Sequence, residues 1–150
     1  MTKIIQADAN DHGILTEITK KSKSYWGYSE EQMNEWSDLL TVSSDYIQVY
    51  QVYKLLVNDL TVAYYSSCNV DEQTVRLDNL FVLPENIGKG YGKLLMKDFL
   101  LKIKQSKAKT IILDADPNAQ KFYESFGFIK VGHVETSIKD RFLPVMELKL

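Results

Sequence analysis

The sequence has little of what disulfide-rich, metal-binding or membrane-spanning proteins depend on. It contains one cysteine, Cys68, so no internal disulfide is available and a reducing, cytoplasmic setting is expected. With two histidines and no CxxC or HExxH spacing, no dedicated metal site is predicted. No stretch approaches the ~20 apolar residues of a membrane span, and no apolar run of signal-peptide type follows Met1.

The remaining composition is that of an ordinary globular protein. Of the 150 residues, 45% are apolar and 25% are charged, and there are only 7 glycines and 3 prolines. These values exclude collagen-like, disordered and coiled-coil chains. A chain of this length buries roughly 70% of its unfolded surface, so it needs no disulfide or metal for stability. We therefore expect a single domain over residues 1–150.

The charges are distributed unevenly. The formal net charge is −2, which taken alone argues against general nucleic-acid binding and against a polyanionic partner. Residues 89–109, however, hold seven lysines and one aspartate, so this segment carries +6 and the rest of the chain −8. The lysines indicate either a solvated helix face or a site for an anionic ligand, and a neighbouring motif must distinguish the two.

Hydrophobic periodicity predicts a mixed α/β fold around one sheet. A short strand at Ile4–Ala7 precedes two helices, each introduced by cap residues. Tyr46–Val82 has the composition of three strands joined by hairpins, and Gly88–Gln105 has that of an amphipathic helix. A short strand at Thr110–Leu113 and a helix at Asn118–Phe126 follow. The last two strands are expected at Phe128–Glu135 and Val145–Leu150. The sheet should be antiparallel early and contain a parallel pair where a helix joins two strands.

The most informative segment is Ile87-Gly88-Lys89-Gly90-Tyr91-Gly92-Lys93, which leads from a predicted strand into the lysine-bearing helix. Glycine permits positive φ, and the first N–H groups of a helix have no partner within it. Together they form a cradle for phosphate. The spacing of its glycines and lysines matches neither the P-loop pattern nor the dinucleotide-binding pattern.

The loop resembles the acyl-CoA loop of the GNAT superfamily of N-acetyltransferases, whose signature is Arg/Gln-x-x-Gly-x-Gly/Ala. Ile87 stands where that family usually has Arg or Gln. Leu77–Glu85 is similar to the family's fourth strand, and Asn118–Phe128 to its late helix with a Tyr-x-x-x-Gly-Phe ending. The resemblance implies a mostly antiparallel sheet with splayed parallel fourth and fifth strands, flanked by about four helices.

The resemblance also implies acetyl-CoA as co-substrate. Its phosphates would lie on the loop and its pantetheine arm along the fourth strand. The polar residues flanking Pro117 would either contact the pantetheine or serve only as turn and N-cap residues. The implied cofactor-binding residues are Leu80, Phe81, Val82, Gly88, Lys89, Gly90, Tyr91, Gly92, Lys93, Asp116 and Asn118.

In this resemblance the chemistry is direct attack of a neutral amine on the thioester. Tyr123 matches the family position that protonates the departing thiolate. Asp78 is a candidate base, acting directly or through water, and its alternative role is to cap a neighbouring amide or bond Asn79. For His133 and Cys68 we expect structural roles.

The family forms its acceptor pocket from the first two helices and the late strands. Here these regions supply Trp26, Tyr28 and the segment 137–144. Trp26 and Trp36 are either core residues or rings of the pocket. Arg141 would either hold a substrate carboxylate or pair with a surface acid.

The sequence thus predicts an acetyl-CoA-dependent N-acetyltransferase acting on a primary amine of a small molecule, without nucleic-acid or membrane partners. A homodimer is allowed. The alternatives are a protein or peptide N-acetyltransferase on the same scaffold and a CoA-binding regulator without turnover. A nucleic-acid-binding protein using the lysine helix would show a steep salt dependence, but it leaves the glycine spacing unexplained.

Overall fold

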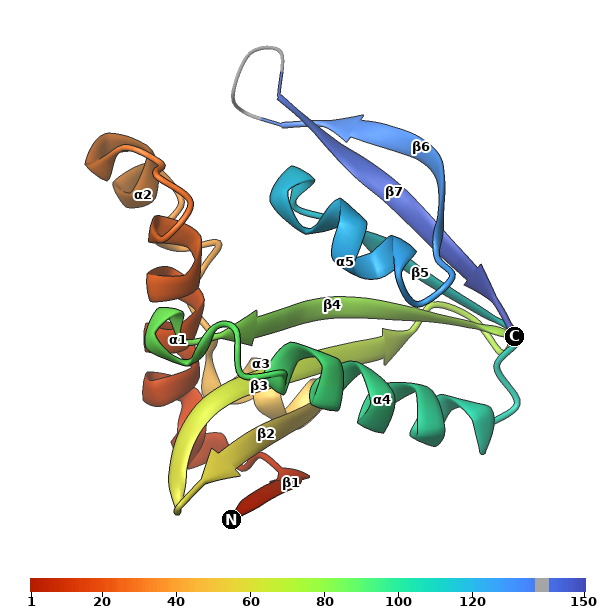
Figure 1. Ribbon diagram of the computed structural model, residues 1–150, viewed down its shortest axis with the longest axis horizontal. Helices are drawn as coiled ribbons and strands as arrows, with labels where there is room; N and C mark the ends of the chain where they lie inside the picture. The colour runs from red at the N-terminus through yellow and green to blue at the C-terminus, as the bar shows by residue number, and fades with distance from the viewer. Residues whose placement is uncertain (137–140) are drawn as a thin grey trace. The chain divides into compact units, whose positions relative to one another are not determined.

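The computed structural model describes residues 1–136 and 141–150 and contains helices and strands in the predicted mixture (Figure 1). The strands are β1 Thr2–Gln6, β2 Gln51–Val57, β3 Leu60–Asn69, β4 Thr74–Val82, β5 Thr110–Asp114, β6 Ile129–Glu135 and β7 Phe142–Lys149. The helices are α1 His12–Ser24, α2 Glu30–Glu35, α3 Ser44–Val49, α4 Tyr91–Lys104 and α5 Gln120–Glu124. Three short 3-10 turns are described. They are η1 Ala9–Asp11 before α1, η2 Pro84–Asn86 before the loop to α4, and η3 Pro117–Ala119 before α5.

The strands follow the order β1-β2-β3-β4-β5-β7-β6 in one hydrogen-bonded sheet. The pairs β1–β2, β2–β3, β5–β7 and β6–β7 are antiparallel, whereas β4–β5 is parallel. This confirms the expected mixed sheet with a parallel pair where α4 joins two strands. The β4–β5 register runs from Thr74↔Thr110 to Arg76↔Ile112, although β4 itself continues to Val82.

The chain forms two compact units, and β4 contributes to both. The first contains Met1–Ser67 and Asn79–Lys102, and the second contains Cys68–Asp78 and Ile103–Leu150. Within the described residues, no helix combines the length and the apolar character needed to cross a membrane.

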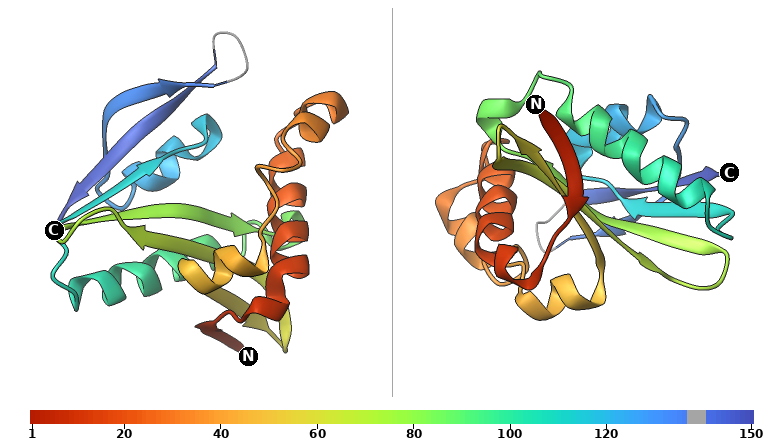
Figure 2. Two further views of the ribbon diagram at one scale, coloured as in Figure 1. Left: turned by 180° about the vertical axis from the view of Figure 1, so that it is seen from behind. Right: turned by 90° about the horizontal axis from the view of Figure 1, so that it is seen from below.

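In the first unit, helices cover both faces of β2 and β3 because neighbouring tyrosines of β3 point to opposite faces. The hydroxyl of Tyr64 bonds Thr19 of α1, and two residues on, Ser66 bonds the Tyr46 hydroxyl of α3 at 2.7 Å. On the other face Tyr65 meets α4. Figure 2 shows α3 and α4 on opposite sides of these strands.

A cluster around Tyr65 attaches α4 to the sheet. The Tyr65 ring packs edge-on against Phe99 at 5.4 Å and stacks with Tyr53 of β2, also at 5.4 Å. Its hydroxyl donates to the Asp98 carboxylate at 2.7 Å, and Lys102 pairs with the same carboxylate. Burial, followed by the Asp98 hydrogen bond, raises the pKa of Tyr65 well above its usual range.

In the second unit, the core lies between α5 and the strands β5 and β7. Ile111, Leu113 and Met146 are almost completely buried. Phe128 packs edge-on against Tyr123 of α5, with ring centroids 5.9 Å apart. Gly127 ends the helical segment with φ +95°, the left-handed conformation expected of a helix-ending glycine.

One predicted element is wrong in type. We expected a strand from Tyr46, but Ser44–Val49 forms α3 and the strand begins at Gln51. The Ser43 hydroxyl caps this helix by accepting the Tyr46 N–H at 3.0 Å. Tyr46 and Tyr50, four residues apart, stack with centroids 4.1 Å apart. Capping and this one-turn stacking outweigh the strand propensity of the aromatic residues.

Replacing Tyr65 by Phe should destabilise the first unit. The variant loses a hydrogen bond to a charged acceptor, so we expect the free energy of unfolding to fall by about 1.5–3 kcal/mol. Because the folded state raises the pKa of Tyr65, the wild type loses this stabilisation as the pH rises above about 10, where the unfolded tyrosine ionises. The difference between wild type and Tyr65→Phe should therefore shrink above that pH.

Urea unfolding at about pH 7.5 and about pH 10.5 measures this effect. Tyr53→Phe is the matched control, because it keeps the ring that stacks on Tyr65 and leaves the Asp98 bond in place. Equal stability losses in the two variants would contradict a role for the Tyr65–Asp98 bond.

Candidate active site

The loop between β4 and α4 begins from an anchored strand end. The Ser22 hydroxyl of α1 donates to the Val82 carbonyl at 2.6 Å, and the Leu83 N–H donates to the Val62 carbonyl of β3 at 2.8 Å. The turn η2 follows, closed by the Asn86 N–H donating to the Leu83 carbonyl. The sequence therefore leaves the sheet at a fixed point, and the next residues are free to shape a loop.

Two glycines give this loop its course. Gly88 and Gly90 have φ +86° and +81°, conformations that L side chains rarely adopt. A Cβ at either position would meet no atom within 4 Å, so conformation and not space requires glycine there. Positive φ at two positions separated by one residue turns the backbone sharply just before α4 begins.

Helix α4 starts directly after the loop. Its first internal hydrogen bond runs from the Leu94 N–H to the Gly90 carbonyl at 3.1 Å. By helix geometry, the N–H groups of Tyr91, Gly92 and Lys93 precede that bond and have no partner within the helix. Lys89 and Lys93 are exposed beside them. The loop and helix start thus bring N–H donors and two cations together, as the sequence predicts.

Tyr123 lies on α5 with 8% of its surface exposed. Phe122 and Phe128 pack edge-on against its ring. Burial, and then the nearby charge of Asp116, raises the pKa of Tyr123 above its usual range. The phenol is therefore protonated at neutral pH, and its role as a proton donor stays a prediction.

Asp116 is the N-cap of η3, and its carboxylate is extensively hydrogen-bonded. Oδ1 accepts the Asn118 backbone N–H at 2.9 Å and the Asn118 Nδ2 at 2.8 Å. Oδ2 accepts Arg141 Nη2 of the segment before β7 at 3.3 Å. The turn and N-cap role considered for Asp116 is thus present, and the cofactor contact remains a prediction. Arg141 pairs with an acidic residue of the protein, which is one of the two roles expected for it.

Asp78 lies exposed on β4 near Cys68. Burial raises the pKa of the Cys68 thiol, the Asp78 charge raises it further, and Arg76 acts in the opposite direction. Cys68 is therefore a poorly ionised, half-buried thiol, consistent with the structural role expected for it. His133 lies in β6 with its ring 4.9 Å from that of Phe142. The assignment of Asp78 as base stays a prediction.

The aromatic residues of the expected acceptor region separate into core and surface. Trp36 is buried and packs edge-on against Tyr28 at 4.9 Å. Trp26 is 46% exposed and meets Tyr25 at 5.1 Å. Of the segment 137–144, residues 137–140 lie outside the described residues.

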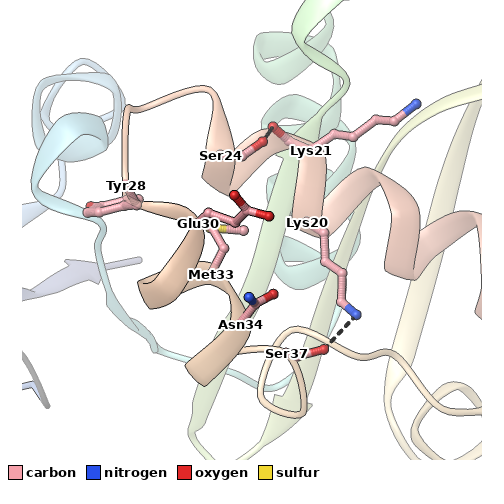
Figure 3. Close-up of a pocket in the computed structure, with 8 residues that line it drawn as sticks. All are labelled: Lys20, Lys21, Ser24, Tyr28, Glu30, Met33, Asn34 and Ser37. Carbon is pink, nitrogen blue, oxygen red and sulfur yellow. Dashed lines mark hydrogen bonds between the residues drawn. The ribbon is translucent and has the colours of Figure 1, made fainter.

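A hollow of about 450 Å³ opens between α1 and α2 (Figure 3), a feature that sequence reasoning missed. Lys20 and Ser24, one turn apart on α1, line it from the helix face opposite buried Ile18 and Ser22. Figure 3 shows the Glu30 carboxylate between the two helices and Tyr28 extending away from it. Ser29 caps α2 by accepting the Gln32 N–H at 3.0 Å, but the cap residues of the expected helix gave no sign that it would face α1.

Solved acetyltransferases share this fold. PaiA N-acetyltransferase from Thermoplasma acidophilum, solved in complex with coenzyme A, is 17% identical, has a TM-score of 0.83 and is matched over 100% of this chain and 99% of its own. The ribosomal-protein-S18-alanine N-acetyltransferase from Escherichia coli is 19% identical, with a TM-score of 0.77 and coverage of 99% and 94%. At these identities the likeness shows the fold alone.

Sequence similarity gives the family. UPF0039 protein C11D3.02c of Schizosaccharomyces pombe is 35% identical over 95 residues, which are 62% of this chain and 61% of that protein. The match therefore spans less than two thirds of that relative's length. The family described as Acetyltransferase (GNAT) domain matches residues 26–150. Because that match covers most of the sequence, the chain belongs to the GNAT acetyltransferase family.

Proposed function

We propose that this protein is an acetyl-CoA-dependent N-acetyltransferase whose acceptor is the primary amine of a small molecule. The observation that carries the proposal is the loop of left-handed Gly88 and Gly90 at the start of α4. It joins an N–H cradle to exposed lysines in a chain of the GNAT family.

The loop fits the phosphates of coenzyme A. The space beyond Gly88 and Gly90 is open for a ligand, and the N–H groups at the helix start, which have no partner within the helix, favour negative charge. Lys89 and Lys93 add positive charge that does not depend on a side chain at position 87, where Ile87 replaces the family's Arg or Gln. The backbone therefore supplies most of the phosphate contact.

Leu80, Phe81 and Val82 form the end of β4, along which the pantetheine arm is proposed to lie. The β4 register with β5 stops at Arg76, so peptide groups further along β4 are candidates to pair with an extended ligand. Ser22 and Val62 hold the strand end in place through the bonds to Val82 and Leu83. Asn118 is the proposed polar contact to the same arm, together with Asp116.

When bound, acetyl-CoA supplies an activated acetyl thioester. The amine must lose a proton, because its ordinary pKa near 10 keeps it mostly charged at neutral pH. Asp78 is the proposed base, directly or through a water. Tyr123 is the proposed acid that gives its proton to the departing thiolate. Trp26 and Tyr28 are proposed to contact the acceptor.

Calorimetry with coenzyme A tests the cofactor, and an amine library scored by release of the CoA thiol tests the reaction. We expect binding and turnover of a small primary amine. Turnover only with peptides would move the assignment to a protein acetyltransferase, and binding without any turnover would indicate a regulator. No binding at millimolar coenzyme A would refute the proposal.

Gly88→Ala and Gly90→Ala should each weaken coenzyme A binding. A side chain in the left-handed region costs about 1–2 kcal/mol, so the loop must either bear strain or change its course. The dissociation constant should rise roughly tenfold, the equivalent of 1.4 kcal/mol. Gly13→Ala is the control, because Gly13 also has open space at its Cβ but lies in helix α1 without positive φ. Calorimetry should show the control within about twofold of wild type.

Tyr123→Phe should lower kcat and spare coenzyme A affinity. Loss of a positioned general acid reduces turnover by roughly 10²–10⁴-fold, while the ring that packs against Phe128 remains. Steady-state kinetics on the acceptor found in the screen, with Tyr53→Phe as control, measures the effect. Unchanged kcat in Tyr123→Phe would remove the tyrosine from the chemistry.

A further inference from the structure

Among the described residues, Asn118 and Arg141, from two parts of the second unit, donate hydrogen bonds to the carboxylate of Asp116. Two of these bonds come from Asn118 and one from Arg141, which is 25 positions away in the sequence. The Asp116 and Arg141 side chains are only 13% and 14% exposed. An ion pair so shielded from water is screened little, and loss of one member leaves the other buried without its partner.

Hydrogen bonds hold the backbone of Arg141 in place. Its carbonyl accepts both the N–H and the hydroxyl of Thr136, at 3.2 and 2.8 Å. The next residue pair, Glu135↔Phe142, begins the β6–β7 ladder. The backbone of Arg141 is therefore part of the strand pair, and its guanidinium links that pair to the turn η3.

The Asp116 carboxylate, which Arg141 holds, sets the orientation of the Asn118 side chain. The Asn118 Nδ2 donates to Asp116, so its side-chain oxygen is the group left to accept an N–H from a ligand. The Ala119 N–H also donates to the Asp116 carbonyl, which closes η3 directly before α5 begins at Gln120. Tyr123 is one helical turn further on, so Asp116 fixes the start of the element that carries it.

We propose that Arg141 is a positioning residue of the transfer reaction: by holding Asp116 it orients the Asn118 carboxamide oxygen and the helix that carries Tyr123, and it does not contact an acceptor carboxylate. This inference rests on the proposed function. The Asp116 charge also contributes to the raised pKa of Tyr123.

The test compares Arg141→Gln with Arg76→Gln. Arg76 forms another arginine–aspartate pair of this unit, with Asp114 at the same 3.3 Å, but this pair joins β4 to β5 instead of holding the N-cap of η3. Calorimetry with coenzyme A and no acceptor is the main measurement. We expect the dissociation constant of Arg141→Gln to rise roughly tenfold, with a similar fall in kcat, and Arg76→Gln to remain within about twofold of wild type.

Two further measurements separate the possible failures. In ligand-free ¹H–¹⁵N spectra, the side-chain amide of Asn118 should shift in Arg141→Gln and not in Arg76→Gln, whether or not the protein binds coenzyme A. Arg141→Lys, which keeps the charge without the guanidinium fork, should restore part of the affinity.

The outcomes are distinct. An unshifted Asn118 amide, or unchanged coenzyme A affinity together with a raised acceptor KM, would overturn the positioning role and favour contact with an acceptor carboxylate. A wild type that binds no coenzyme A would refute the proposed function, and the Asn118 spectra would still decide whether Arg141 orients this turn.

Discussion

The hydrogen bond from buried Tyr65 to Asp98 fixes where α4 lies, and the loop before that helix depends on it. Asp98 comes from the second turn of α4, and Tyr65 from the middle of β3. Phe99 packs on the same ring, and Lys102 pairs with the same carboxylate while lying 4.3 Å over the Tyr53 ring. These contacts hold the helix axis, so the N–H groups at its start have a defined direction relative to the end of β4.

The other constraint on the loop acts from the opposite face of the sheet. Ser22 of α1 bonds the Val82 carbonyl, and Thr19, almost one turn earlier, bonds Tyr64. The strand end is therefore held by α1 while the helix after it is held by Tyr65. Only the short stretch between them is left to adopt the left-handed conformations of Gly88 and Gly90. A loop with both ends fixed keeps its N–H groups in place before a ligand arrives, which reduces the entropic cost of binding.

The sequence predicted features whose causes are local. Asn58 and Asp59 both adopt positive φ in the turn between β2 and β3, one of the expected hairpins, and the glycine loop lies between strand and helix as expected. Helix α3 escaped prediction because a serine cap and a tyrosine pair outweigh strand propensity over six residues. The Asp116–Arg141 pair joins residues 25 positions apart, so their spacing in the sequence carried no sign of it; a fold was needed to bring them together.

The start of α4 carries basic residues, whereas acidic residues are usually favoured at the N-terminus of a helix. Acids begin α2 and α3, at Glu30, Glu31 and Asp45, where they stabilise the positive helix end. The first turn of α4 has no acid and instead follows Lys89 and includes Lys93. The single acid of the lysine segment, Asp98, is already engaged by Tyr65 and Lys102, so it does little to offset these cations. Positive charge is thus concentrated at a helix end that is itself positive, an unfavourable arrangement that a bound phosphate would reverse. The departure from the local rule therefore lies at the proposed binding site, where function is the physical reason for tolerating it.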